Sequence, residues 1–360
     1  MARWRGVLWG CCAALFAHLI SVLAAHNPMW VERLYSRLLY PPLGRILSRV
    51  TSIVPISLAE LAVVVLIATL LIGVIHFFWR GWRQPRQLVG HLRWALTIAL
   101  FAYAAFTLLW GLNYHRQPLA EILGLEVGPA SIQELVDLCT DLLQRTNELR
   151  QLQVEDENQV MTLAGGKWRA LGRAPLGYRE LAKQLPQVAG HFGPPKGVRL
   201  SKWWSYTGTA GMYFPFTGEA NVNMAMPDVN IPVVACHELA HQRGFAREDE
   251  ANYLAYLACI NHPDVEFQYS GLFMALSQAM RALQRVDGEA FAALRAQYHP
   301  GLIRDLEANR DFWQAFSGPI EQLSERMNDA YLKSNRQADG VQSYGRMVDL
   351  LIAARRAANR

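Results

Sequence analysis

The chain has 360 residues, 52% of them hydrophobic, and a formal net charge of +5. Length and apolar content together leave room for a membrane region and one soluble domain. Much of the positive charge lies in loops beside apolar stretches, so it does not indicate nucleic-acid binding, and we expect no nucleic-acid partner.

Three apolar stretches are close to the roughly 20 residues that a helix needs to cross a bilayer. They run over about 7–23, 58–78 and 94–112. Tryptophans, which are common at membrane interfaces, gather near their ends: Trp30, Trp79, Trp82, Trp94 and Trp110. We therefore predict a multi-pass membrane region over 1–112 and a soluble domain over 113–360. For the first stretch, a cleaved signal peptide is the alternative.

Arginines in the loops set the expected orientation, because cytoplasmic loops are enriched in basic residues. They precede the first span and crowd the short loop between the second and third: Arg3, Arg5, Arg80, Arg83, Arg86 and Arg93. This pattern places the soluble domain outside the cytoplasm. The longer loop over 26–53 also carries four arginines, which argues the other way. Its leucine and arginine spacing suggests an amphipathic helix whose arginines meet lipid headgroups.

The soluble domain begins with scaffold helices. Ser131 and Glu134 form a capping box before a run of leucines, so a helix starts there. A second helix is expected over 178–188. Cys236 and Cys259 match no zinc or redox spacing, and Cys236 is either a small core residue or a partner of Cys259.

From Val198 the sequence changes to short aromatic segments separated by glycines, which is typical of strands and turns. Pro215 and Gly218 within 212–223 suit an edge strand, which could pair with an extended peptide. An aromatic core hairpin is the alternative. Glu219 is either a turn residue, which we favour, or a partner of a metal ligand.

The segment His-Glu-Leu-Ala-His over 237–241 is the most informative in the chain. Histidines four residues apart share one helix face, so His237 and His241 can bind one Zn²⁺ ion. Glu238 can act as general base toward the water that such an ion activates. A chance match on an amphipathic helix is the alternative. Residues typical of helix ends flank the segment: Asn230, Pro232 and Gly244.

A catalytic zinc site needs a third protein ligand. The position that an extended His-Glu-x-x-His-x-x-Gly-x-x-His motif would use is Arg247, which has no lone pair to donate. The next carboxylates begin a second apolar helix that ends before Pro263. Glu250 shares a face with buried leucines of this helix, so we predict Glu250 as the third ligand and Glu248 as the alternative. A helix-start charge stabilised by the dipole would also explain Glu250.

The run over 237–245, followed by Glu-Asp-Glu-Ala-Asn, resembles an uncharacterised bacterial family of membrane-anchored, zincin-like proteins known as a domain of unknown function. The resemblance extends to 211–223, 331–333 and 340–344 and, with the three spans, covers nearly the whole chain. The Glu-Ala-Asn step is also similar to that of zincin-like phage antirepressor peptidases, whose Glu before Ala-Asn is the third zinc ligand. This similarity implies the same role for Glu250.

The chain after Gln268 is again helical, with Gly340 as an expected helix break. Peptide hydrolysis needs a hydrogen-bond donor for the developing oxyanion, and tyrosine often supplies it beside zinc. Tyr344 is our candidate, with Tyr213 second, although either could be a packed aromatic residue.

The sequence thus predicts a mainly α protein with a small β element, in which transmembrane helices precede a zincin-like α+β metallohydrolase domain. We expect a zinc peptidase of the bacterial cell membrane that acts on a peptide or protein of the cell envelope and contacts membrane lipid. The alternatives are a zinc amidase acting on cell-wall peptides and a non-catalytic membrane scaffold stabilised by zinc. An intact Glu238 argues against the scaffold, which needs no base.

Overall fold

The computed structural model describes residues 4–79 and 85–360, of which side chains 85–87 are not described. The protein is mainly helical, with 72% helix and 5% strand, as the sequence predicts. It divides into two compact units. The N-terminal unit comprises residues 1–117 and 214–219, and the C-terminal unit comprises 118–213 and 220–360. Arg3, Arg80, Trp82 and Arg83, which enter the orientation and interface arguments, lie outside the described residues.

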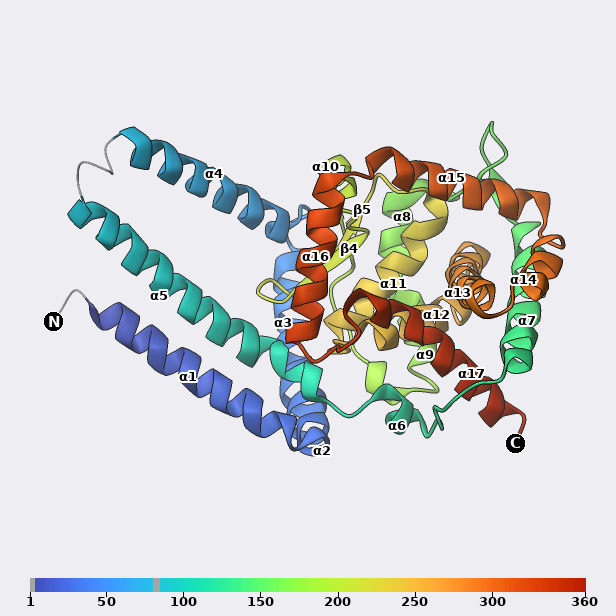
Figure 1. Ribbon diagram of the computed structural model, residues 1–360, viewed down its shortest axis with the longest axis horizontal. Coiled ribbons are helices and arrows are strands. Elements are labelled where there is room, and N and C mark those ends of the chain that lie inside the picture. The colour runs from blue at the N-terminus through green and yellow to red at the C-terminus, as the bar shows by residue number, and fades with distance from the viewer. Residues whose placement is uncertain (1–3, 80–84) are drawn as a thin grey trace. The chain divides into compact units, whose positions relative to one another are not determined.

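The N-terminal unit contains three helices long and apolar enough to cross a membrane (Figure 1). With their connecting elements they are α1 (Arg5–Ala25), α2 (Pro28–Trp30), the π-helical η2 (Val31–Leu39), α3 (Tyr40–Ser52), α4 (Leu58–Trp79), α5 (Pro85–Leu109) and the 3-10 helix η4 (Gly111–His115). The third span ends at Leu109, earlier than the predicted 112, because the chain tightens into η4, whose Leu112 and Asn113 are buried.

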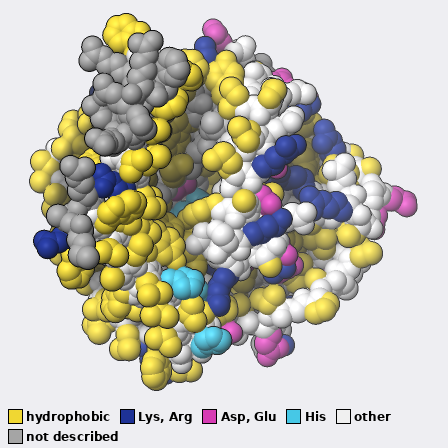
Figure 2. Space-filling model, turned by 60° about the vertical axis from the view of Figure 1, so that its left-hand side comes forward, with side chains coloured by type: hydrophobic (Ala, Val, Ile, Leu, Met, Phe, Trp, Pro, Cys, Tyr) yellow, Lys and Arg dark blue, Asp and Glu magenta, His cyan; other side chains and the backbone are white. Residues whose placement is uncertain are grey.

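Helices α1 and α5 pack closely because α1 presents glycines to its neighbour. A Cβ on Gly10 would lie 3.0 Å from the Cβ of Leu100, and one on Gly6 would lie 3.4 Å from Thr97. Small residues four apart permit such close approach between membrane helices. The remaining helix surfaces expose apolar side chains, drawn in yellow over these helices (Figure 2).

The segment between the first two spans, η2 with α3, has several polar side chains inside and several large apolar ones outside, next to buried Val31 and Tyr40 and exposed arginines. It buries Glu32, Ser36 and Ser48 and exposes Leu38 and Ile46. Within the N-terminal unit, the buried Arg116 donates to Glu32 at 2.8 Å, so the inner carboxylate is paired. The exposed apolar side chains beside arginines agree with the predicted amphipathic helix in contact with lipid.

Glu219 has a role that the sequence does not reveal. Its carboxylate accepts hydrogen bonds from the backbone N–H groups of Leu58 (3.1 Å) and Ala59 (2.8 Å), at the start of α4, and from Thr217 (2.8 Å). A carboxylate at a helix N-terminus satisfies donors that have no partner within the helix and is favoured by the helix dipole. Glu219 is thus a capping residue of α4, which is long and apolar enough to cross a membrane, rather than a simple turn residue.

The C-terminal unit is an assembly of helices with two small sheets. Its helices are α6 (Leu119–Leu123), α7 (Ile132–Arg150), α8 (Gly166–Arg173), α9 (Pro175–Leu181), η5 (Pro186–Val188), α10 (Ser201–Ser205), η6 (Asp228–Asn230), α11 (Ile231–Gln242), α12 (Glu248–Ile260), α13 (Val265–Val286), α14 (Gly288–Arg295), α15 (Pro300–Phe316), α16 (Pro319–Ser334), η7 (Gly340–Arg346) and α17 (Met347–Ala358). Its strands are β1 (Val154–Glu155), β2 (Met161–Thr162), β3 (Lys196–Val198), β4 (Gly211–Phe214) and β5 (Glu219–Asn223).

The core of this unit is formed by α7, α11, α12, α13 and α17, which contact one another and bury their apolar faces (Figure 1). The capping box predicted at Ser131 and Glu134 is present at the start of α7. The helix predicted over 178–188 is instead the shorter α9 followed by η5. Leu185, the residue before Pro186, has φ −125° and ψ 82°, and this non-helical conformation separates the two helices.

The larger sheet has the strand order β3-β5-β4, and β3 pairs with β5 in parallel, Lys196 opposite Asn221 and Val198 opposite Asn223. Strand β4 is therefore at an edge, as Pro215 and Gly218 predict. Gly218 has φ +67° in the turn that joins β4 to β5, a conformation that favours glycine.

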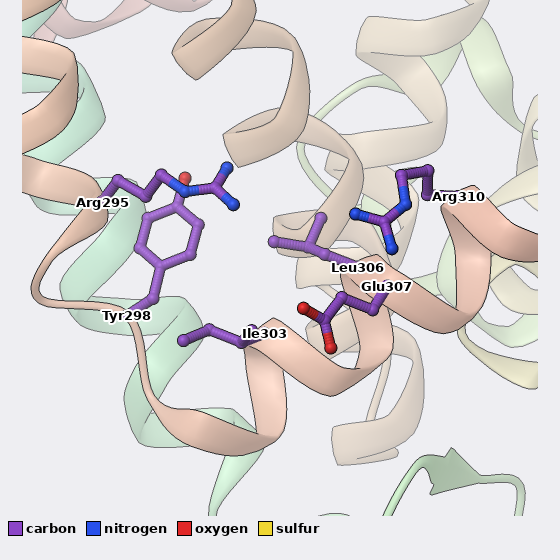
Figure 3. A pocket seen from close by; sticks show the side chains of 6 residues that line it. All are labelled: Arg295, Tyr298, Ile303, Leu306, Glu307 and Arg310. Atoms are coloured by element: carbon purple, nitrogen blue, oxygen red, sulfur yellow. The ribbon is translucent and has the colours of Figure 1, made fainter.

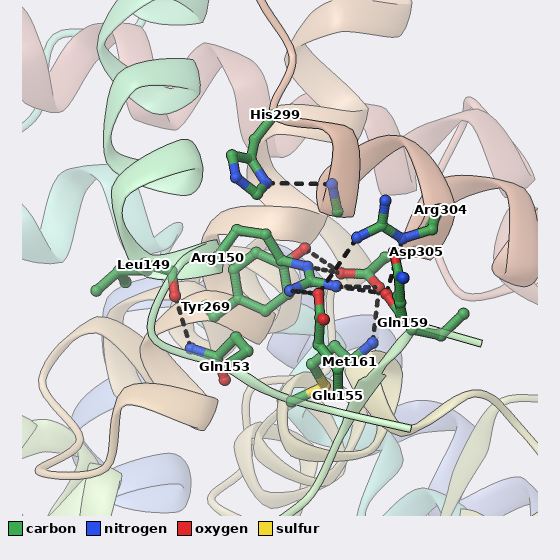
Figure 4. A network of polar contacts seen from close by, with 12 residues as sticks. Leu149, Arg150, Gln153, Glu155, Gln159, Met161, Tyr269, His299, Arg304 and Asp305 are labelled. Atoms are coloured by element: carbon green, nitrogen blue, oxygen red, sulfur yellow. Dashed lines mark hydrogen bonds and ion pairs between the residues drawn. The ribbon is translucent and has the colours of Figure 1, made fainter. Parts of the chain in front are cut away.

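A buried polar network joins α7, α13, α15 and the β1–β2 hairpin (Figure 4). Asp305 is fully buried and accepts hydrogen bonds from Arg150 (2.6 Å), the Met161 backbone (2.8 Å) and the Tyr269 hydroxyl (2.5 Å). Arg150 also pairs with Glu155 at 2.9 Å. The charges are thus paired and hydrogen-bonded, as buried charges must be.

Candidate metal centre

Helix α11 carries the His-Glu-Leu-Ala-His segment within the C-terminal unit. Its ends follow the sequence: Asn230 is the N-cap, Pro232 lies in the first turn, and Gly244 has φ +85° just beyond the end. Asn230 makes no capping hydrogen bond with its side chain, which donates to Asn309 instead. His237 and His241 are one helical turn apart, and their rings lie 4.6 Å apart between centroids.

The third side chain of this cluster is Glu248, not Glu250. Ligand atoms of His237, His241 and Glu248 all lie within 4.8 Å of one another. Glu250 is buried, as predicted, but its carboxylate accepts hydrogen bonds from the Leu119 backbone (2.8 Å) and from Arg247 (2.9 Å). The helix-face argument therefore identified Glu250 as buried, but its carboxylate contacts Leu119 and Arg247 rather than the histidines. Glu248 is the first residue of α12, and helical side chains lean toward the N-terminus, which is the end of α12 nearest to α11.

The three ligand atoms form a small triangle. The two Nε2 atoms are 3.0 Å apart, and the Glu248 Oε2 lies 3.2 Å from Nε2 of His237 and 3.5 Å from Nε2 of His241. In a tetrahedral zinc site with bonds of about 2.0–2.1 Å, neighbouring ligand atoms are about 3.3–3.4 Å apart. The observed distances fit a small tetrahedral cation such as Zn²⁺.

Hydrogen bonds on the far side of each ring determine which nitrogen faces the cluster. Nδ1 of His237 lies 2.8 Å from the Asn252 Oδ1, and Nδ1 of His241 lies 2.7 Å from the Phe245 carbonyl oxygen. Both partners are acceptors, so each Nδ1 must carry a proton and donate it. In the neutral rings, both Nε2 lone pairs then point at each other and at a carboxylate. A proton shared with Glu248 or a metal cation would neutralise the repulsion between these acceptors, and the outer hydrogen bonds are those typical of metal-binding histidines.

The Asn252 amide is itself held in place, because its Nδ2 donates to the Tyr344 carbonyl oxygen at 3.2 Å. This leaves its Oδ1 to accept from His237. Sequence reasoning did not single out Asn252 as a site residue. It stands directly after the Glu-Ala pair of the recognised run, four residues from Glu248, where a helix places it on the same face.

Glu238 lies beside the cluster against the edge strand β4. Its carboxylate accepts a hydrogen bond from the Tyr213 backbone N–H, while its buried Oε2 has no hydrogen-bond partner. Gly211 makes this approach possible, since a Cβ there would lie 2.4 Å from the Glu238 Oε1. The edge strand thus fixes the position of the predicted general base, and Tyr213 contributes its backbone.

Burial and mutual charge set the ionisation of these groups. Burial raises the pKa of Glu238 to about 7. Burial alone would raise the pKa of Glu248, but His241 and His237 outweigh it and hold that pKa well below its ordinary range. Burial alone would lower the pKa of His241, but Glu248 outweighs it and raises that pKa to about 9. Glu248 is therefore an anion suited to bind a cation, and Glu238 can exchange a proton near neutral pH.

The C-terminal segment borders the cluster. The Tyr344 hydroxyl is hydrogen-bonded to Glu248 and to Asn328, and burial raises its pKa well above the ordinary value. The Gln337 Oε1 accepts from the Glu248 backbone N–H at 3.1 Å. Tyr344 thus lies at the site as predicted, and its assignment as oxyanion donor stays a prediction. His237 keeps 13% of its side chain exposed, which leaves the cluster open to solvent on that side.

The two cysteines of the core, Cys236 and Cys259, form no disulfide. Both are free and buried, and their side chains are hydrogen-bonded to each other.

The C-terminal unit also has a surface pocket away from the candidate metal centre. This pocket has a volume of about 130 Å³ and is formed by α14, α15 and the segment between them (Figure 3). Six side chains line it: Arg295, Tyr298, Ile303, Leu306, Glu307 and Arg310. None of these has a buried polar atom without a partner, so the pocket gives no indication of a ligand.

In a comparison with protein families, residues 35–352 match a protein family of unknown function (DUF3810). The chain belongs to this family. The match covers helices α4 and α5 and the whole candidate metal centre. Comparison with curated proteins gives no match, and comparison with solved structures gives none.

Proposed function

We propose that this protein is a membrane-anchored, zinc-dependent hydrolase that cleaves peptide bonds. The observation that carries the proposal is the convergence of two Nε2 atoms and one carboxylate oxygen at 3.0–3.5 Å, with both Nδ1 protons fixed by acceptors. His237, His241 and Glu248 would hold the ion. When bound there, Zn²⁺ would polarise a carbonyl group and lower the pKa of water toward neutrality.

Glu238 supplies the acid–base chemistry in this proposal. Its carboxylate is oriented by the Tyr213 N–H, has a free buried oxygen and has a pKa of about 7. A group with these properties can accept a proton from the attacking water and return it to the leaving amine. Tyr344 is the proposed donor to the developing oxyanion.

Three protein ligands rather than four favour catalysis over a structural role. Structural zinc sites are usually closed by four protein ligands, whereas catalytic sites keep one position for water or substrate. Among the described residues, the metal-binding group contains three side chains. A purely structural site also has no need of an oriented carboxylate beside it. The proposed amidase reaction on cell-wall peptides would use the same residues and differs only in substrate.

The proposal places the metal centre outside the cytoplasm of a bacterial cell, since arginines are densest in the loop between the second and third spans. Substrates would then be envelope proteins, exported peptides or cell-wall peptides. Alkaline phosphatase and a fluorescent protein, each fused after Arg360, report the orientation. Phosphatase activity is expected, whereas fluorescence without phosphatase activity would reverse the orientation.

The deciding experiment compares the purified full chain with Glu238→Gln. Both should contain one zinc by elemental analysis. Glu238→Gln should lower cleavage of peptide-library and cell-wall substrates by about 10²–10⁴-fold, the usual contribution of a general base. Glu157→Gln, an exposed carboxylate, is the matched control and should leave cleavage unchanged. Zinc in both proteins with equal cleavage would support the scaffold instead, and a parent that binds no zinc would contradict both functions.

A further inference from the structure

Helix α16 exposes apolar side chains to its surroundings, where a helix of a soluble protein usually has polar ones. Ile320, Leu323, Met327 and Tyr331 are between 40% and 66% exposed. At 100° per residue, these four positions lie within about 80° of one another, so they form one continuous stripe. Leu332, on another face of the helix, is fully buried and fixes which side packs inward. An apolar stripe of this kind on a helix indicates a binding surface.

Exposed aromatic residues of α10 lie next to the start of this stripe. Trp203 is 69% exposed, and its ring contacts that of Tyr206 with 6.1 Å between centroids. Tyr206 in turn packs on Phe316 at 4.9 Å, just before α16 begins. Tryptophan and tyrosine are the residues enriched where proteins meet the headgroup layer of a bilayer.

We propose that α16 and α10 form a lipid-binding surface, with the α16 stripe and Trp203 inserted into the interfacial layer of the bilayer. A similar exposure of apolar side chains occurs in η2–α3, which shows leucines beside arginines between the first two candidate spans. Both helices that flank this segment, α1 and α4, are long and apolar enough to cross a membrane, so lipid can cover its exposed leucines. Exposed Lys202 and Arg326 flank the α10 and α16 residues and suit anionic headgroups.

Chain connectivity keeps the start of the C-terminal unit close to the end of α5. The third span ends at Leu109 and the C-terminal unit begins at Pro118, a connection of at most about 30 Å even when fully extended. The surface is also close in sequence to the metal centre, because α16 leads directly to Gln337 and Tyr344, which contact Glu248 and Asn252. Lipid binding by α16 would favour substrates at the membrane surface.

The test uses the full chain in liposomes of phosphatidylcholine and phosphatidylglycerol, with an environment-sensitive fluorophore on single cysteines. Cys11→Ser and Cys12→Ser remove the exposed thiols, and the remaining three cysteines are buried. Met327→Cys and Trp203→Cys place the label on the proposed surface. Gln322→Cys, exposed on another face of α16, is the matched control.

Labels at Met327 and Trp203 should emit at shorter wavelength than the Gln322 label. Lipids with a nitroxide near the headgroup should quench the labels at Met327 and Trp203 at least about twofold more strongly than the label at Gln322, as expected for an interfacial helix. Equal quenching at all three positions would overturn the proposal. So would a label at Met327 that is shifted but not quenched, because a second copy or another protein would then cover the stripe. Zinc content and cleavage are not part of this readout, so it stands apart from the test of the proposed function.

Discussion

Two buried polar clusters of the C-terminal unit differ in how completely their groups are paired. In the network around Asp305, the carboxylate accepts three hydrogen bonds from charged and neutral donors, so positive and negative groups alternate (Figure 4). In the cluster around His237 and His241, three atoms that can each bind a cation face one another at 3.0–3.5 Å, and the buried Oε2 of Glu238 has no hydrogen-bond partner.

The difference separates a structural role from a chemical one. A buried network that satisfies its own members stabilises the fold and needs nothing from outside. A buried cluster whose ligand atoms converge on one point, beside a carboxylate oxygen without a hydrogen bond, is stabilised when a cation binds. Removing a member should therefore lower stability in the first cluster and metal affinity or activity in the second.

Replacing Asp305 should have the largest effect of the variants described below. This replacement should change the stability of the fold and leave metal binding unchanged. Asp305→Ala leaves Arg150 buried without its main partner, which costs about 3–5 kcal/mol of unfolding free energy for a buried ion pair. Denaturant unfolding of the detergent-solubilised chain measures this loss of unfolding free energy. Asp311→Ala, an exposed residue of the same helix, should change stability by no more than about 0.5 kcal/mol. Equal effects of the two variants would show that the network is not structural.

Replacing Glu248 or Glu250 distinguishes the two acidic residues at the start of α12. Glu248→Ala should lower zinc affinity by at least about 100-fold, because it removes a ligand rather than an outer partner. Glu250→Ala should keep its zinc and lose only the contacts to Leu119 and Arg247, at a cost of about 1–3 kcal/mol in unfolding free energy. Elemental analysis of both proteins decides, and zinc retained in Glu248→Ala but lost in Glu250→Ala would reverse the assignment.

Replacing Gly211 should impair chemistry without removing the metal. The added Cβ would lie 2.4 Å from the Glu238 Oε1, so Gly211→Ala must displace the general base. A displacement of about 1 Å can cost about 10²-fold in rate. Cleavage and zinc content are measured together. Gly172→Ala, where a Cβ meets nothing within 4 Å, is the control. Unchanged cleavage by Gly211→Ala would argue against the position of Glu238 in catalysis.

Replacing Asn252 should give the smallest effect. Asn252→Ala removes the acceptor that fixes the His237 ring, and outer partners of this kind usually contribute about 10–100-fold to metal affinity. Competition with a zinc chelator measures the change. Asn261→Ala, just past the other end of α12, should leave the affinity as it is. Equal affinities of the two variants would mean that the His237 tautomer is fixed by another group.

Local patterns explain why much of the fold was predictable. The capping box at Ser131, the left-handed Gly244 and the edge position of β4 depend on residues close in sequence. The three spans follow from length and apolar content alone. By contrast, the end of the third span and the split of the helix predicted over 178–188 depend on buried contacts of η4 and on Pro186.

The sequence by itself determined that His237 and His241 share a helix face, that Glu238 lies beside them, and that a carboxylate at the start of the next helix is buried. These follow from helical periodicity within single elements. Only the tertiary structure decided that Glu248 rather than Glu250 meets the histidines, that Asn252 and Phe245 orient their rings, and that Glu219 caps α4. Periodicity shows which side of a helix faces inward, but the neighbour on that side depends on how separate elements pack.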